Sequence, residues 1–227
     1  MFNMFENTQS GSADQSAQEL VVQWSKPEAE RAGTPLLVMF HGFGSNEADL
    51  LSLAPHLPEE FTIASLRAPL REGMGYKWFH LMQSLDYSFD EVKTSVNLAL
   101  NWLDEVKANH TKVVLFGFSM GMAMATSLLR HRPAEYDAVI GCSGFAIDAG
   151  NDPFFDDAAV AERKPNLFWG RDQQDPVITQ DKVEFTNEWA RTHVDLTKIN
   201  YTNMMHSISA QEIAHINEYL RVKVLSA

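Results

Sequence analysis

The chain has 227 residues, of which 45% are hydrophobic and 21% charged, and its formal net charge is -12. This length and composition are typical of one water-soluble α/β domain with a sizeable core. The acidic balance argues against nucleic acid as a partner and against charge-driven docking on anionic membranes, because both require clustered Lys and Arg. The single cysteine, Cys142, excludes an internal disulfide and fits a reducing compartment.

The N-terminal residues differ in composition from the rest. Residues 1–18 are rich in Asn, Gln and Ser, and they lack the basic start and apolar core of a signal peptide. We predict a flexible tail over residues 1–18 and a single α/β domain over residues 19–227. Because no apolar stretch approaches the roughly 20 residues of a membrane span, we expect a cytoplasmic protein without stable membrane insertion.

Strand-like and helix-like patterns alternate along the chain. Short apolar runs bounded by turn residues predict strands at residues 19–25, 36–40, 61–66, 112–116, 136–142, 166–170 and 197–204. Helical spacing of apolar residues predicts helices at 47–56, 89–110, 122–130, 181–193 and 210–222. Residues 67–86 and 143–164 show neither pattern and are predicted to be irregular. The alternation implies crossover connections, hence a mostly parallel central sheet with helices on both faces and an antiparallel hairpin at the N-terminal edge.

A Gly-x-Ser-x-Gly sequence, Gly117-Phe118-Ser119-Met120-Gly121, lies between a predicted strand and a predicted helix. The two glycines allow a tight turn that leaves the serine exposed at the carboxyl end of the strand. This arrangement resembles the nucleophile elbow of α/β-hydrolases, and we therefore predict that fold with Ser119 as the nucleophile.

A serine nucleophile needs a base and an acidic residue that orients the base, and in this fold the order along the chain is Ser, Asp or Glu, then His. Two aspartates, Asp172 and Asp175, follow the predicted strand 166–170. We favour Asp175, because Pro176 makes the loop rigid and biases the preceding residue to an extended conformation. Asp172 remains the alternative.

Three histidines follow these aspartates. His193 lies at the end of one predicted helix and His215 lies inside another. His206 lies between the last predicted strand and the last predicted helix, where the fold places the catalytic base. We predict that His206 is that base.

The transition state also requires two hydrogen-bond donors for the oxyanion. The backbone N–H of Met120 follows the nucleophile, and the backbone N–H of Phe43 lies in an early glycine-containing loop. We predict that these two groups form the oxyanion hole and that His41 braces the loop through hydrogen bonds.

Four segments together resemble the phospholipase/carboxylesterase family of serine hydrolases, which includes acyl-protein thioesterases and small bacterial carboxylesterases. These segments are residues 41–47, 117–121, 175–178 and 206–207. The resemblance implies a triad of Ser119, Asp175 and His206 and oxyanion donors at Phe43 and Met120. It also implies that the pair Trp78-Phe79 lies near the acyl group. The chain departs from the thioesterase branch at Met120, where that branch often has Gln.

We therefore predict a serine esterase that cleaves short- to medium-chain carboxylic esters, acts on a small-molecule acyl ester, and needs no cofactor or metal. The alternatives are a lysophospholipase or acyl-protein thioesterase acting on long acyl chains and, more remotely, a non-catalytic binding module. Whether Phe154 and Phe155 line the acyl pocket stays open. We expect a solvated loop at the acidic residues 152, 156 and 157.

Overall fold

A computed structural model of the chain describes residues 20–226, so the tail predicted over residues 1–18 lies outside the described residues. The described part holds a large sheet with the strand order β1-β3-β2-β6-β7-β8-β9 and a small sheet made of β4 and β5. The strands of the large sheet are β1 Val22–Trp24, β2 Leu36–Phe40, β3 Thr62–Leu66, β6 Val113–Phe118, β7 Ala138–Cys142, β8 Asn166–Asp172 and β9 Asp195–Tyr201. The helices are α1 Glu47–Leu51, α2 Phe89–Val106, α3 Met120–His131, α4 Asp157–Arg163, α5 Gln180–His193 and α6 Ala210–Leu220.

Every pairing in the large sheet is parallel except that of β1, which pairs antiparallel with β3. This confirms the predicted fold class, a mostly parallel sheet with an antiparallel N-terminal edge. The expected hairpin between the first two strands is wrong, because both edges of β2 are occupied by parallel neighbours, β3 and β6. The first strand therefore pairs one position further out, against β3.

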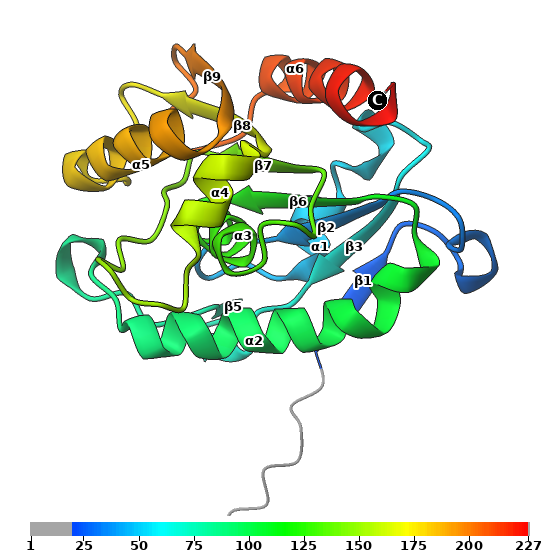
Figure 1. Cartoon of the computed structure of the whole chain (residues 1–227), viewed down its shortest axis with the longest axis horizontal. Helices are drawn as coiled ribbons and strands as arrows, with labels where there is room; N and C mark the ends of the chain where they lie inside the picture. The colour runs from blue at the N-terminus through cyan, green and yellow to red at the C-terminus, as the bar shows by residue number, and fades with distance from the viewer. Residues whose placement is uncertain (1–19, 227) are drawn as a thin grey trace, which may run out of the picture.

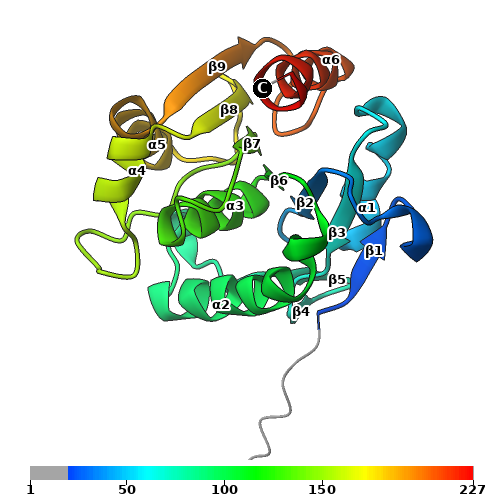
Figure 2. The same ribbon diagram turned by 45° about the vertical axis from the view of Figure 1, so that its right-hand side comes forward.

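The side chains of β2 alternate between the two faces of the sheet, as those of a central strand must. Leu36, Val38 and Phe40 pack in a core with α2, α3 and α5. Leu37 and Met39 pack in a second core with α1 and α6. Figures 1 and 2 show the same layers, with α2 and α3 on one side of the sheet and α6 on the other. The sheet is thus covered on both faces, which is why its central strands are continuously apolar.

Two segments predicted to be irregular contain regular structure. Residues 67–86 include the antiparallel pair β4 Leu70–Glu72 and β5 Gly75–Lys77, and residues 143–164 include α4. The three-residue strands and the seven-residue helix are too short to show a hydrophobic period. The start of α4 is fixed by Asp156, whose side chain accepts a hydrogen bond from the N–H of Ala159 at 3.0 Å.

The predicted helix 47–56 is shorter than expected. It ends at Leu51, and a 3₁₀ turn, Ala54–His56, contains Pro55. Proline cannot donate the backbone hydrogen bond that would continue the helix. Across residues 20–226, no helix combines the length and the apolar character needed to cross a membrane.

Candidate active site

Ser119 lies at the turn between β6 and α3, and its backbone has φ 55° and ψ -120°. A non-glycine residue at positive φ is strained, and the surroundings must hold it in place. The Ser119 N–H donates a hydrogen bond to the carbonyl of Cys142 on the neighbouring strand β7 at 2.9 Å. The nucleophile predicted from the sequence therefore stands on a sharp, anchored turn at the carboxyl end of the sheet.

The two glycines of the turn are required by close backbone contacts. A Cβ atom at Gly121 would lie 1.8 Å from the carbonyl oxygen of Phe40, and one at Gly117 would lie 2.1 Å from the carbonyl oxygen of Gly121. Helix α3 therefore packs directly on the backbone of β2 and β6. This close approach fixes the position from which Ser119 projects.

A hydrogen-bonded series joins the serine to a histidine and an aspartate. The His206 Nε2 atom lies 3.0 Å from Ser119 Oγ, and the His206 Nδ1 atom lies 2.9 Å from Asp175 Oδ2. The Asp175 side chain is fully buried, whereas 18% of the His206 side chain is exposed. The three residues come from loops that follow β6, β8 and β9. Parallel strands bring these loops together at one edge of the sheet.

Asp175 is held as a carboxylate by its neighbours. Its Oδ1 atom accepts a hydrogen bond from the N–H of Val177 at 2.8 Å, which leaves Oδ2 for His206. Burial opposes ionisation of Asp175, but the hydrogen bonds from His206 and Val177 outweigh it and lower the pKa of the carboxyl group. An ionised Asp175 fixes the orientation of the imidazole ring.

Asp172, the alternative acid, has a different position. Its Oδ2 atom accepts hydrogen bonds from the N–H groups of Met204 and Met205 at 2.7 and 2.8 Å, and its Oδ1 atom accepts one from Gln174 at 2.9 Å. These bonds tie the end of β8 to the loop that carries His206. Of the two aspartates that the sequence left open, Asp175 contacts His206 and Asp172 holds the backbone just before it.

The other two histidines lie away from Ser119. His193 ends α5, and its Nδ1 atom lies 2.8 Å from the carbonyl of Trp189. His215 lies on α6, and its Nδ1 atom lies 3.0 Å from the hydroxyl of Tyr201.

The early loop carries the second predicted oxyanion donor. Within residues 20–226 the N–H of Phe43 forms no hydrogen bond, whereas the next N–H, that of Gly44, donates to Tyr76 at 2.9 Å. Met120 is the first residue of α3, where N–H groups lack a partner one turn earlier in the helix. Phe43, Ser119 and Met120 line the same hollow.

His41 braces this loop. Its Nε2 atom lies 3.1 Å from the N–H of Ala68 and therefore accepts, so that Nδ1 carries the proton and donates to the carbonyl of Gly42 at 2.7 Å. Burial lowers the pKa of His41 and keeps the ring neutral. These are hydrogen bonds of the kind expected for this residue from the sequence.

The hollow in front of Ser119 has a volume of about 490 Å³. Its apolar lining includes Leu81, Leu85, Met120, Phe145, Val177 and Ile178. Apart from Met120, sequence reasoning did not identify these residues as pocket-lining. They lie on separate segments without a shared hydrophobic period, so only the fold brings them together.

Trp78 and Phe79, predicted to lie near the substrate, are fully buried and do not line this hollow. The Trp78 indole N–H donates to the carbonyl of His41 at 3.0 Å, and the Trp78 backbone N–H lies 3.3 Å from the sulfur of Met120. Trp78 therefore supports the early loop and the start of α3, both of which contribute residues to the hollow.

Phe154 and Phe155 also lie elsewhere. The ring of Phe154 stacks on His131 with centroids 4.1 Å apart, and the guanidinium of Arg130 lies 4.0 Å above the Phe155 ring. Neither residue lines the hollow in front of Ser119. Both pack on the C-terminal end of α3, at the opposite end of the helix from Ser119.

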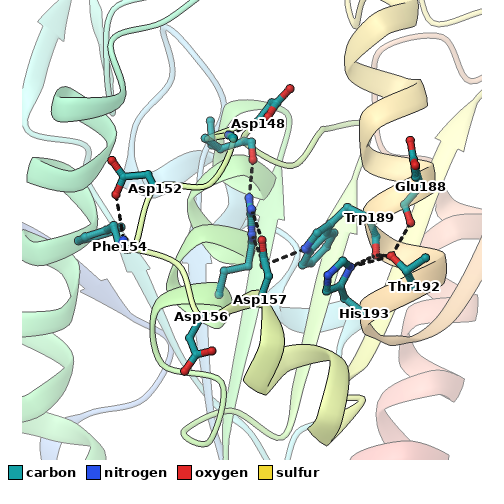
Figure 3. Close-up of polar contacts among 12 residues, drawn as sticks. Asp148, Asp152, Phe154, Asp156, Asp157, Glu188, Trp189, Thr192 and His193 are labelled. Atoms are coloured by element: carbon teal, nitrogen blue, oxygen red, sulfur yellow. Dashed lines mark hydrogen bonds and ion pairs between the residues drawn. The ribbon is translucent and has the colours of Figure 1, made fainter.

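The acidic residues next to these phenylalanines have separate structural roles (Figure 3). Asp157 forms an ion pair with the buried Arg130 at 2.6 Å and accepts a hydrogen bond from the Trp189 indole at 3.0 Å. Asp152 accepts one from the N–H of Phe154 at 2.9 Å, and Asp156 caps α4. The expectation of a solvated loop thus holds for the exposed Asp156, whereas Asp157 ties α4 to α3 and α5.

A parallel sheet of this order, with a strained serine between a strand and a helix and a histidine-aspartate pair on later loops, defines an α/β-hydrolase fold. Residues 25–224 match the model of the Phospholipase/Carboxylesterase family, and the chain belongs to that family. Family membership classes it among the carboxylic ester hydrolases.

Two solved structures and one sequence relative are similar to this chain. A carboxylesterase of Bacillus cereus is 19% identical, with a TM-score of 0.73 over 91% of this chain and 95% of the other. The acyl-protein thioesterase 2 of Zea mays is also 19% identical, with a TM-score of 0.68 over 89% and 98% of the two chains. An uncharacterized hydrolase of Saccharomyces cerevisiae is 23% identical over 171 residues, which are 75% of this chain. The match spans only about half, 53%, of that yeast protein.

Proposed function

We propose that the protein hydrolyses carboxylic esters of short to medium acyl length through a covalent acyl-enzyme. The observation that carries this proposal is the hydrogen-bonded series from Ser119 Oγ through His206 to Asp175, which opens onto an apolar hollow. A serine hydroxyl is a weak nucleophile by itself, and a histidine oriented by a buried carboxylate supplies the base that it needs.

The first half-reaction transfers the acyl group to the enzyme. His206 Nε2 removes the proton of Ser119 as Oγ attacks the ester carbonyl carbon. The negative charge that develops on the carbonyl oxygen is stabilised by the backbone N–H groups of Phe43 and Met120. His206 then gives its proton to the leaving alcohol oxygen, the C–O bond breaks, and the alcohol departs.

The second half-reaction repeats these steps with water. His206 removes a proton from a water molecule, and the resulting hydroxide adds to the acyl-serine carbonyl. When the tetrahedral intermediate collapses, the proton returns to Ser119 Oγ and the carboxylic acid is released. The ionised Asp175 stabilises the imidazolium that forms in each half-reaction.

The size of the hollow supports short to medium acyl chains. Its volume of about 490 Å³ lies in the lower half of the range of about 300 to 1,000 Å³ that ligand pockets cover. Its lining is mostly aliphatic and aromatic, which suits an acyl chain without charge.

The test is the hydrolysis of p-nitrophenyl acetate, butanoate, octanoate and palmitate by the wild type and by Ser119→Ala. We expect the greatest kcat/KM on acetate or butanoate, and a loss of about 10⁴-fold or more in kcat for the variant. The matched control is Ser88→Ala. Ser88 is exposed and directly precedes α2, so this variant should retain full activity.

A maximum on palmitate would move the substrate class to that of a lysophospholipase or acyl-protein thioesterase. Activity that persists in Ser119→Ala would refute the nucleophile, and the lack of any turnover in the wild type would favour a binding module.

A further inference from the structure

A second hollow adjoins the first beside His206. Its volume is about 220 Å³, and its lining includes Asp49, Leu50, Leu53, Phe118, His206 and Ile208. Three of these residues, Asp49, Phe118 and His206, also line the hollow in front of Ser119. The two hollows therefore meet at the histidine that the proposed reaction uses as acid and base.

The chemistry assigns one half of an ester to each hollow. The group that protonates the leaving oxygen must lie within hydrogen-bonding distance of it, so the alcohol has to emerge beside His206 Nε2. The acyl group then occupies the other side, where Met120 and Phe145 line the larger hollow. The smaller hollow is placed to receive the alcohol.

The junction of the two hollows carries a negative charge. Asp49 is exposed, and its Oδ2 atom accepts a hydrogen bond from the Ser45 hydroxyl at 2.6 Å. Within residues 20–226 no Lys or Arg lies within ion-pair distance of Asp49. The Lys77 ammonium lies 5.7 Å from the centre of the Phe43 ring but is paired with Glu72. Asp49 is thus a carboxylate without a cationic partner at the entrance to the catalytic residues.

Aromatic side chains lie on the same surface. Phe43 is 43% exposed and lines a shallow hollow together with Asp49, and Phe118 lines both hollows beside His206. Aromatic faces attract ammonium groups, and an adjacent carboxylate adds to that attraction. A phosphate or sulfonate would instead meet the Asp49 carboxylate, because the described residues that line these hollows include no Lys or Arg.

Resting on the function proposed above, we propose that the hollow beside His206 binds the leaving alcohol, and that Asp49 makes this site selective for alcohols that carry an ammonium group. The substrate class is then an ester between a short or medium carboxylic acid and a cationic amino alcohol. Esters whose alcohol carries a phosphate and no ammonium group are disfavoured by the same charge.

The sharpest test uses two esters of the same shape. Choline butanoate and 3,3-dimethylbutyl butanoate differ in that a quaternary nitrogen replaces a carbon. Because the ammonium group also makes choline the better leaving alcohol, the contribution of Asp49 is read from the change in their kcat/KM ratio when Asp49 is replaced. We expect Asp49 to raise the ratio in favour of the choline ester by about fivefold at low salt, the size of a favourable exposed ion pair. Added NaCl should lower the ratio, because salt screens exposed charges.

The variant Asp49→Asn removes the charge and keeps the shape of the side chain. We expect its ratio to be about fivefold lower than that of the wild type, whereas the matched control Glu105→Gln, at an exposed position on α2, should keep the wild-type ratio. The 2-sulfoethyl ester of butanoic acid should react more slowly than the neutral ester in the wild type, and this deficit should shrink in Asp49→Asn.

A wild-type ratio of 1 or less, or a ratio that Asp49→Asn leaves unchanged, overturns the proposal. If neither alkyl ester reacts, inhibition of p-nitrophenyl butanoate hydrolysis by choline and by 3,3-dimethylbutan-1-ol gives the same comparison, and equal inhibition overturns it. The failure of the general function is recognised separately, because p-nitrophenyl butanoate would then also resist hydrolysis.

Discussion

Glu212 lies buried against Cys142 on β7 and Gly170 on β8, without a cationic partner for its charge among the described residues. It occupies the first turn of α6, none of its surface is exposed, and both carboxyl oxygens lack a hydrogen-bond partner in the described chain. Cys142 is adjacent, and a Cβ atom on Gly170 would lie 1.9 Å from Oε1. Burial raises the pKa of Glu212 from 4.5 to about 7, against the smaller opposing effects of the Cys142 thiol and the Ser209 backbone.

This pKa makes stability depend on pH. Between pH 4.5 and 7 the folded protein keeps the Glu212 proton while the unfolded chain loses it, so the free energy of unfolding falls as the pH rises. The loss is complete above pH 7. The difference between a pKa of 4.5 and one of about 7 corresponds to about 3 kcal/mol at about 1.4 kcal/mol for each pKa unit.

We predict that Glu212→Gln removes this dependence. Glutamine has the shape of the protonated acid, and any cost of burying its amide is the same at every pH. The free energy of unfolding, measured by urea denaturation at pH 5 and pH 8, should rise relative to the wild type by about 2 to 3 kcal/mol more at pH 8 than at pH 5.

The control is Glu105→Gln, which removes one exposed carboxylate from α2. The free energy of unfolding of this variant should differ from that of the wild type by nearly the same amount at pH 5 and at pH 8. If the free energies of unfolding of Glu212→Gln and the wild type also differ by the same amount at pH 5 and pH 8, Glu212 does not hold its proton in the folded protein, and the reasoning is refuted.

Two further predictions concern side chains that position others. Asp172→Asn should lower kcat for p-nitrophenyl butanoate by on the order of tenfold to a hundredfold with little change in KM, because the His206 loop loses a charged acceptor. An unchanged kcat would show that Asp172 does not position His206. Arg130→Met should lower the free energy of unfolding by about 3 kcal/mol, because Asp157 loses its cationic partner, and adding Asp157→Leu should recover part of that loss. Thermal denaturation of the two variants checks this, and an additive loss in the double variant would show that the ion pair is not the cause.

The parts of the site that follow strands were predictable from the sequence. Ser119 and Asp175 each lie just beyond an apolar strand, and His206 follows the last, more polar strand β9. Parallel strands place their carboxyl ends at one edge of the sheet. The sequence favoured Asp175 because of Pro176, but it left Asp172 as an alternative, since both follow the predicted strand 166–170. The choice depends on which carboxylate the turn directs toward the His206 ring and which it directs toward the backbone.

The pocket was not predictable in the same way. The aromatic pair Trp78-Phe79 suggested a substrate contact, yet both rings are buried behind the hollow, and Phe145 and Leu81 line it instead. Aromatic composition does not distinguish a residue that lines a cavity from one that supports its wall. That distinction depends on the direction in which each side chain points, and in an irregular loop no hydrophobic period reveals this direction.

The sequence determined the order along the chain of the main strands and helices, the fold class and the residues at the strand ends, because hydrophobic period and glycine spacing are local properties. The tertiary structure decided which face each loop side chain covers, that Asp49 and His206 line the same hollow, and that the Glu212 carboxyl group is buried without a cationic partner in the described part of the chain. These features depend on contacts between residues far apart in the chain, and their energies arise only when the packed fold excludes water from them.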